Sequence, residues 1–138
     1  MANEALVQEI KKIVSLARSG NLDEAYSGYR NLFASPAFMT YRPEEQRQAL
    51  RLMIYAKGVP SQPTPAMVEA HRAAVAPLTQ LVEQYREPAD HEMLGMCEVI
   101  LGNEEAAGAI FRAGLAIERQ INPQSDLCGA LMKRISLL

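Results

Sequence analysis

A stretch of fourteen residues occurs twice in the chain in closely similar form, and this duplication limits the folds that the chain can adopt. The first copy is GNLDEAYSGYRNLF, from Gly20 to Phe33, and the second is GNEEAAGAIFRAGL, from Gly102 to Leu115. Aligned without gaps, the copies share Gly, Asn, Ala and Arg at the first, second, sixth and eleventh positions, with an aromatic residue at the tenth. A glycine followed by a capping residue and acidic residues is typical of a turn that opens a helix. We therefore expect one helix-turn-helix unit to occur more than once.

The apolar residues recur at intervals of three and four along nearly the whole chain, which predicts helices and no sustained strand. The first helix is expected over about 4–18, from the spacing of Leu6, Ile10, Ile13, Val14 and Ala17. Helices are expected to end at three glycines, Gly20, Gly58 and Gly102. Helices are expected to begin at three prolines, Pro43, Pro65 and Pro88.

Several caps and one break follow from the same local rules. Asn21 and Asn103 are expected to cap the second and sixth helices with their side chains, with Glu24 closing a capping box. Thr64 is expected to cap the fourth helix, and Ser125 or Asp126 the last one. Pro77 lies inside the fourth helical pattern and is expected to kink or break it.

These elements predict an all-α fold, an antiparallel array of helix hairpins with about seven helices. A length of 138 residues suits one domain spanning 1–138. The hairpins are expected at about 4–34, 43–86 and 88–121, followed by a C-terminal helix at 125–137. A single hairpin cannot bury its own apolar stripe, so neighbouring hairpins are expected to stack.

Composition excludes several classes of partner. The apolar fraction of 49% can supply a core, and the formal charge of −2 gives no general attraction for nucleic acid or anionic lipid. No secretory signal is recognisable at the start, and no apolar run approaches the roughly 18 residues of a membrane span. The two cysteines, Cys97 and Cys128, are too few for a disulfide framework. We therefore expect a cytoplasmic protein that binds neither nucleic acid nor membrane.

The third pair of helices resembles the tetratricopeptide repeat. The residues that carry the resemblance are Leu94-Gly95, the turn residue Gly102, the small residue Ala107, the packing aromatic Phe111 and, several residues late, Pro123. The first pair keeps Gly20, Ala25, Tyr29 and Pro36, but Lys12 and Ile13 replace Leu-Gly, so its helices are expected to cross differently. The middle pair departs most, with Arg51 at a small-residue position and a proline loop inserted at 59–65. The alternative is an unrelated helical bundle whose glycines only end helices.

The resemblance implies that the first helix of each pair lines a concave groove for a peptide or a partner helix. By alignment, the groove residues are Ile10, Val14, Gln48, Leu52, Tyr55, Glu92, Met96 and Val99. Most are apolar, which suits an amphipathic helix or an extended apolar peptide, with Tyr55 and Met96 as the main anchors. The family's carboxylate clamp needs Lys, Asn and Arg where this chain has mainly Ile, Val, Leu and Met, so an acidic C-terminal tail is not favoured. Burial of these residues against a neighbouring helix or a second copy is the alternative.

No pattern of catalytic residues is present in the sequence. His71 and His91 belong to different helices, and the chain has neither a HExxH motif nor a phosphate-binding loop. His91, Met93, Met96 and Cys97 form a group of soft ligands that could hold copper, but core packing is the favoured interpretation. Cys97 has no identifiable pair of groups to activate it as a nucleophile. We therefore expect no enzyme activity, no metal and no cofactor.

The favoured function is that of an interaction module or adaptor that binds a segment of another protein. The alternative is a self-associating structural subunit, either a homodimer or part of a larger assembly, because the chain ends in the apolar residues Ile135, Leu137 and Leu138. A small-ligand pocket near His71 or His91 is the third hypothesis. Three arginines, Arg42, Arg47 and Arg51, form a stripe that is either a solvated face or a contact for an acidic partner.

Overall fold

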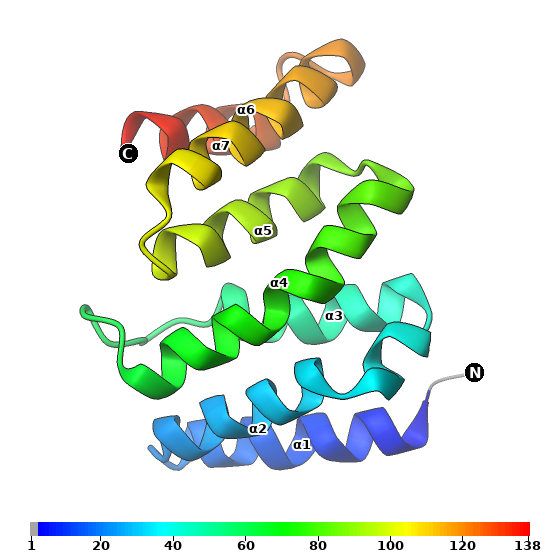
Figure 1. Ribbon diagram of the computed structural model, residues 1–138, viewed down its shortest axis with the longest axis vertical. Helices are drawn as coiled ribbons and strands as arrows, with labels where there is room; N and C mark the ends of the chain where they lie inside the picture. Colours follow the sequence, from blue (N-terminus) through cyan, green and yellow to red (C-terminus); the bar gives the residue numbers. More distant parts are fainter. Residues whose placement is uncertain (1–2) are drawn as a thin grey trace. The chain divides into compact units, whose positions relative to one another are not determined.

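The computed structural model describes residues 3–138 and is helical throughout, with no strand in that range. Its elements are α1 (Glu4–Arg18), α2 (Leu22–Ala34), the 3₁₀ helix η1 (Pro36–Thr40), α3 (Pro43–Ile54), α4 (Pro65–Tyr85), α5 (Pro88–Ile100), α6 (Glu104–Ile121) and α7 (Asp126–Ser136), as drawn in Figure 1. The predicted all-α class with about seven helices is confirmed. No helix within 3–138 combines the length and the apolar character needed to cross a lipid bilayer.

The contacts divide the chain into two compact units rather than one. The first unit is Met1–Pro77 and the second is Leu78–Leu138, so the boundary lies inside α4. The sequence predicts a kink or a break at Pro77. α4 stays α-helical through this residue, so the helix is not broken there, although Pro77 itself has no N–H to donate. Pro77 is fully buried.

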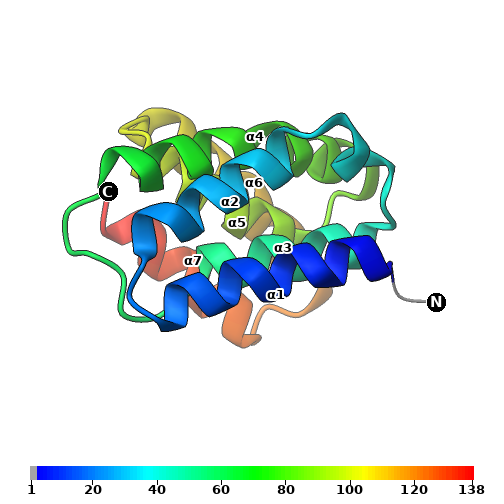
Figure 2. The same ribbon diagram turned by 90° about the horizontal axis from the view of Figure 1, so that it is seen from below.

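The first unit is built from two layers of helices. α1 and α3 lie side by side in one layer, while α2 and the first half of α4 form the other (Figure 2). The backbone N–H of Asn3, before α1, donates to Glu45 Oε2 of α3 at 2.9 Å, which ties the starts of these two helices together. The ring of His71, on α4, lies 6.2 Å from that of Tyr26, on α2.

Aromatic rings form much of the core of the first unit. Phe33 stacks on Tyr29 with ring centroids 5.7 Å apart and meets Phe38 edge to face at 5.1 Å. Phe38 belongs to η1, is completely buried, and also contacts Tyr41 at 5.9 Å. The sequence predicts only an interruption after α2. The 3₁₀ turn that carries Phe38 into the core was not anticipated, because it depends on these ring contacts.

The two copies of the repeated stretch begin with the same hydrogen-bonded turn. Gly20 and Gly102 have φ angles of +89° and +82°, which a residue with a Cβ rarely adopts. The Asn21 N–H donates to Leu16 O at 2.9 Å and the Gly20 N–H to Ala17 O at 3.1 Å. The second copy repeats both bonds at 2.8 and 3.0 Å, which is a Schellman motif in each case. The duplicated sequence thus encodes a duplicated helix ending.

The predicted caps are confirmed in part. Thr64 Oγ1 accepts from the Met67 N–H at 3.2 Å, and Ser125 Oγ accepts from the Cys128 N–H at 3.1 Å. The asparagine caps are wrong: neither Asn21 nor Asn103 makes a side-chain cap bond. Their amides donate backwards across the turn instead, that of Asn103 to Glu98 Oε2 at 2.9 Å.

The third helix also ends earlier than predicted. α3 stops at Ile54, whereas the sequence places its end at Gly58. The N–H of Tyr55 still donates to Arg51 O, but that of Ala56 reaches back only to Met53 O, at 3.4 Å, so the helix tightens and ends.

The α1–α2 and α5–α6 hairpins pack closely because a glycine of one helix faces a large side chain of the other. In the second unit, α5 packs along α6, and a Cβ at Gly95 would overlap the ring of Phe111. In the first unit the arrangement is reversed, because a Cβ at Gly28 of α2 would lie 2.8 Å from Cγ1 of Ile13 on α1. The bulk at Ile13, which replaces the glycine of the repeat pattern, is therefore accommodated by a glycine on the facing helix.

The second unit has a core shared by its last helices. Ala107, Phe111 and Leu115 of α6 form one buried cluster with Cys128 and Leu131 of α7. Leu127 and Ile135 are partly buried and pack against this cluster.

The tight contact between Gly95 and Phe111 predicts a large cost for a single methyl group. We expect Gly95→Ala to lower the free energy of unfolding by about 2 kcal/mol, because the overlap forces the two helices apart. Gly129→Ala is the matched control, since a Cβ there meets no atom within 4 Å and the site is exposed. We expect the control to raise stability by about 0.5–1 kcal/mol through helix propensity. Urea denaturation followed by circular dichroism measures both, and equal stabilities for the two variants would contradict the packing described here.

Candidate partner-binding groove

A groove of about 650 Å³ lies in the first unit between α1, α2 and α3. Its lining residues are Val14, Ala17 and Arg18 from α1, Leu22, Ala25, Tyr26 and Tyr29 from α2, Leu52 and Met53 from α3, the turn residue Gly20, and the segment 56–59 after α3. Most of these side chains are apolar or aromatic. α1 and α3 end on the same side of the unit, where α2 begins (Figure 2), so the groove lies toward that end.

Local sequence features explain why these side chains meet. Val14, Ala17 and Arg18 follow one another at intervals of three and one, so they share one side of α1. Ile13, next to Val14, is buried and packs on Gly28 of α2. The turn at Gly20 then reverses the chain, and α2 adds its own residues opposite. Leu52 remains 43% exposed beside the buried Met53, so the groove has an apolar floor and an accessible apolar rim.

Two tyrosines of α2 bring hydroxyl groups to this groove. Tyr26 and Tyr29 are only 4% and 6% exposed, and both line the groove. Burial raises the pKa of both hydroxyls, and that of Tyr29 is raised further by the neighbouring Tyr26. Both groups are therefore neutral hydrogen-bond donors near neutral pH. Among residues 3–138, no protein group forms a hydrogen bond with either hydroxyl.

The charged side chains at the groove are both basic. Arg18 ends α1, and Lys57 lies in the turn after α3. Neither makes an ion pair within the described part of the chain. The described residues that line the groove include no Asp or Glu. The groove therefore combines apolar surface with hydrogen-bond donors and positive charge.

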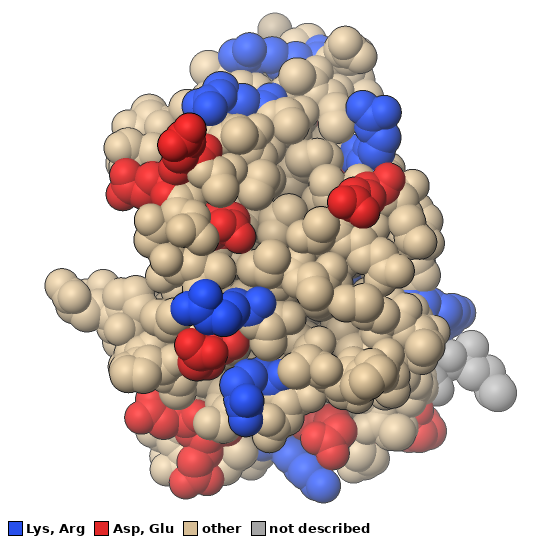
Figure 3. Space-filling view, viewed as in Figure 1, with Lys and Arg blue, Asp and Glu red and all other residues tan. Residues whose placement is uncertain are grey.

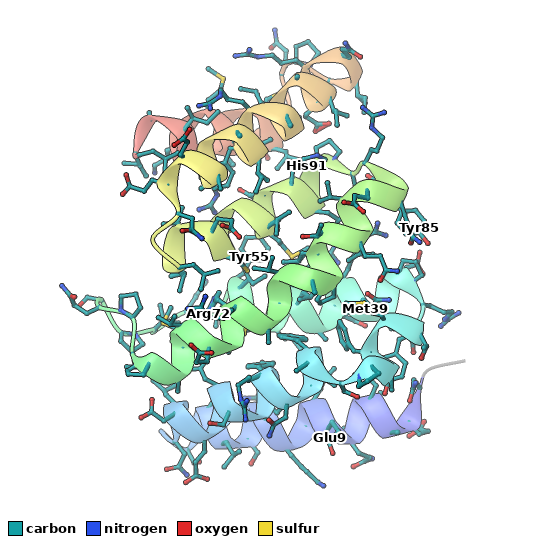
Figure 4. All side chains as sticks on the ribbon, in the orientation of Figure 1. Glu9, Met39, Tyr55, Arg72, Tyr85 and His91 are labelled. Carbon is teal, nitrogen blue, oxygen red and sulfur yellow. The ribbon has the colours of Figure 1, made fainter. Side chains whose placement is uncertain are left out.

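Only some of the residues predicted from the repeat alignment lie in this groove. Val14 and Leu52 are brought together there. Ile10 is half-buried and Gln48 exposed, and neither lines the groove. Tyr55, labelled in Figure 4, is 41% exposed just after the end of α3 and is likewise not part of the lining.

The other three predicted groove residues belong to the second unit. Glu92 is buried and pairs with Arg134 of α7, with Nε and Oε2 2.7 Å apart. Met96 is half-buried against the cluster shared by α6 and α7. Val99 alone of the three is exposed, at 41%. For Glu92 and Met96, contact with the chain's own last helix is thus the observed arrangement.

The polar residues of the groove were missed by sequence analysis. The repeat alignment assigns the groove to the first helix of each pair, whereas Tyr26 and Tyr29 lie on the second. The available signal was their spacing of three residues, together with the turn at Gly20 that brings them back over α1. Sequence analysis could not place Arg18 and Lys57 at the same groove, because their positions there depend on how α1 and α3 pack.

A second cavity, of about 610 Å³, lies in the second unit and is lined in part by Glu83, Arg86 and His91. His91 lies near the start of α5 (Figure 4), and its Nδ1 is 2.8 Å from the carbonyl of Glu87, the residue before α5. The described residues contain no group of three or more His, Cys, Asp or Glu side chains placed to hold a metal ion. Neither cavity brings together a nucleophile, a base and an orienting group.

The thiol of Cys97 is poorly suited to nucleophilic chemistry. Burial, and then the charge of Glu98, raise its pKa to about 12, so it stays protonated near neutral pH. Its place on α5 is completely buried. Met93 and Cys97 are core side chains. They belong to the group of possible copper ligands that also includes His91 and Met96.

The outer surface carries charges of both signs. On the face drawn in Figure 3, acidic and basic side chains are interspersed among uncharged residues. The arginine of one exposed pair, Arg72, lies 3.3 Å from Glu69 one helical turn away. Such a surface provides no extended basic area for a nucleic-acid backbone on that face.

No model of a known protein family matches this chain, and neither curated proteins nor solved structures give a match. The likeness to the tetratricopeptide repeat therefore depends on the motif residues themselves.

The buried His71 makes stability depend on pH. Burial lowers its pKa from the ordinary 6.5, against the effect of its hydrogen bond with Met67 O at 2.7 Å. The unfolded chain therefore takes up a proton below about pH 6.5 while the native side chain stays neutral, so stability falls as the pH decreases through this range. His71→Gln removes this pH-dependent contribution to stability, because glutamine does not titrate. We expect the stability difference between wild type and variant, measured by urea denaturation, to shrink as the pH falls below about 6.5. Parallel stability curves across this range would contradict the prediction.

Proposed function

We propose that this protein is an interaction module that binds a short segment of another protein in the groove between α1, α2 and α3. The observation that supports this most is the exposed Leu52 at the rim of a groove whose floor contains buried apolar side chains. Burying a side chain of leucine size contributes about 1.5–3 kcal/mol. Two or three such anchors contribute about 3–9 kcal/mol in total before the costs of ordering the peptide are subtracted.

The architecture supports the same proposal. The duplicated Schellman turns and the glycine contacts within two hairpins are consistent with an array of tetratricopeptide-like pairs. Such arrays present extended surfaces that bind other chains. Both cysteines are free and buried, which is consistent with a reducing compartment, and we place the protein in the cytoplasm as an adaptor without cofactor or catalytic site.

A specific observation also favours self-association as a second candidate function. Three apolar residues near the C-terminal end of the chain are strongly exposed, Ile121 at 71%, Met132 at 49% and Leu137 at 75%. In a stacked array the last hairpin would present such residues to a further helix pair. Analytical ultracentrifugation of wild type and Leu137→Gln tests this, because a dimer formed through Leu137 would dissociate in the variant.

The groove proposal predicts that Leu52 contributes directly to binding. Peptides are first selected against the full chain from a library of random linear sequences displayed on phage. We expect Leu52→Gln to weaken the affinity of a selected peptide about tenfold, because it removes an apolar anchor. Fluorescence anisotropy with the labelled peptide measures the change.

Two control variants separate this groove from other surfaces. Met39→Gln alters a side chain of η1 that is similarly exposed, at 38%, and does not line the groove, so binding should persist. Val99→Gln tests the wider groove that the repeat alignment predicts. Unchanged affinity for Leu52→Gln would exclude the proposed site, and a loss confined to Val99→Gln would place binding on α5.

A further inference from the structure

The polar side chains of the groove can all donate hydrogen bonds, and its two charged ones, Arg18 and Lys57, cannot accept any. The hydroxyls of Tyr26 and Tyr29 lie on side chains more than nine-tenths buried, and within residues 3–138 no protein group bonds with them. Neither hydroxyl oxygen is fully buried in the free protein, but a ligand that covers the groove removes both from solvent and has to supply a hydrogen-bond partner. A ligand with oxygen atoms that accept hydrogen bonds would provide a partner for both hydroxyls.

The two tyrosines occupy neighbouring positions on one side of α2, and both line the groove. The influence of Tyr26 on the pKa of Tyr29 shows that the two groups interact electrostatically. Tyr26 and Tyr29 are three residues apart on α2, so they project from the same side of the helix. Both rings are fixed by aromatic neighbours, Tyr26 by His71 and Tyr29 by Phe33, so little side-chain freedom would be lost on binding.

The positive charge of the groove favours a ligand group with a negative charge. Arg18 and Lys57 come from different helical segments, yet both line this groove without an acidic partner among the described residues. Two cations beside neutral donors favour a carboxylate over an uncharged carbonyl. They do not favour a fully apolar ligand, which would leave both hydroxyls unpaired.

We propose that the occupant is an apolar peptide segment that carries one acidic side chain, whose carboxylate accepts hydrogen bonds from Tyr26 and Tyr29 and lies in the field of Arg18 and Lys57. Leu52 and Val14 contact the apolar residues beside this side chain. The inference rests on the proposed function and adds the chemistry of the partner. It concerns a side chain within the segment, held by residues outside the positions of the family's carboxylate clamp.

The first test compares selections from the same phage library against three forms of the full chain. Wild type is expected to enrich sequences with Asp or Glu next to apolar residues. The double variant Arg18→Glu, Lys57→Glu should lose this enrichment. Lys11→Glu, Lys12→Glu is the matched control, because it makes the same change in net charge at two exposed residues of α1 that do not line the groove. The control should retain the acidic preference.

The second test measures the hydroxyl contribution directly. A synthetic copy of the dominant peptide and its Glu→Gln or Asp→Asn form are titrated against wild type and Tyr29→Phe. We expect the amide form to bind wild type about tenfold more weakly, and Tyr29→Phe to weaken the acidic peptide about fivefold. The same variant should bind the amide form nearly as wild type does, because the coupling between hydroxyl and carboxylate is already lost. Circular dichroism confirms that each variant is folded.

The outcomes separate this inference from the function on which it rests. Peptides that bind through Leu52 without any acidic preference would overturn the inference and leave the interaction module in place. Equal effects of Tyr29→Phe on both peptides would also overturn it, since that result indicates a packing change only. A library that yields no binder dependent on Leu52 would overturn both proposals.

Discussion

The close approach of α1 to α2 and of α5 to α6, made possible in each pair by a glycine facing a large side chain, is the contact on which the rest of the structure depends. In the second unit Gly95 receives Phe111, and in the first Gly28 receives Ile13. A glycine on either helix serves equally well, because what matters is that one member of the facing pair has no Cβ. In the first unit this contact turns Ile13 inward and leaves Val14 at the groove.

The groove owes its character to an imbalance between donors and acceptors. Apolar side chains supply most of its surface, and such a surface alone would accept many ligands. The hydroxyls of Tyr26 and Tyr29 and the charges of Arg18 and Lys57 limit the range of ligands, since a ligand with acceptor oxygens can pair with all four groups. Specificity in this site would then come from the polar groups and affinity from the apolar ones.

Local effects were predictable from sequence, and effects that need a distant partner were not. Helix starts at Pro43, Pro65 and Pro88 are confirmed, because a missing N–H at the first helical position is a property of the residue itself. The cap expected of Asn103 is wrong, because its amide finds the carboxylate of Glu98 across the turn. The site was predictable only in part: Val14 and Leu52 follow from the alignment with the repeat pattern, but Met96 packs on the cluster of α6 and α7.

The sequence by itself determined the all-α class, the number of helices and the duplicated turn, because spacing, proline and glycine act within a few residues. Only the tertiary structure decided which side chains share a groove, how Phe38 joins the core through a 3₁₀ turn, and that contacts divide within α4. Each of these depends on groups far apart in the chain, whose meeting is set by how helices pack. Periodicity places a residue on a face of its helix, but only packing determines what that face meets.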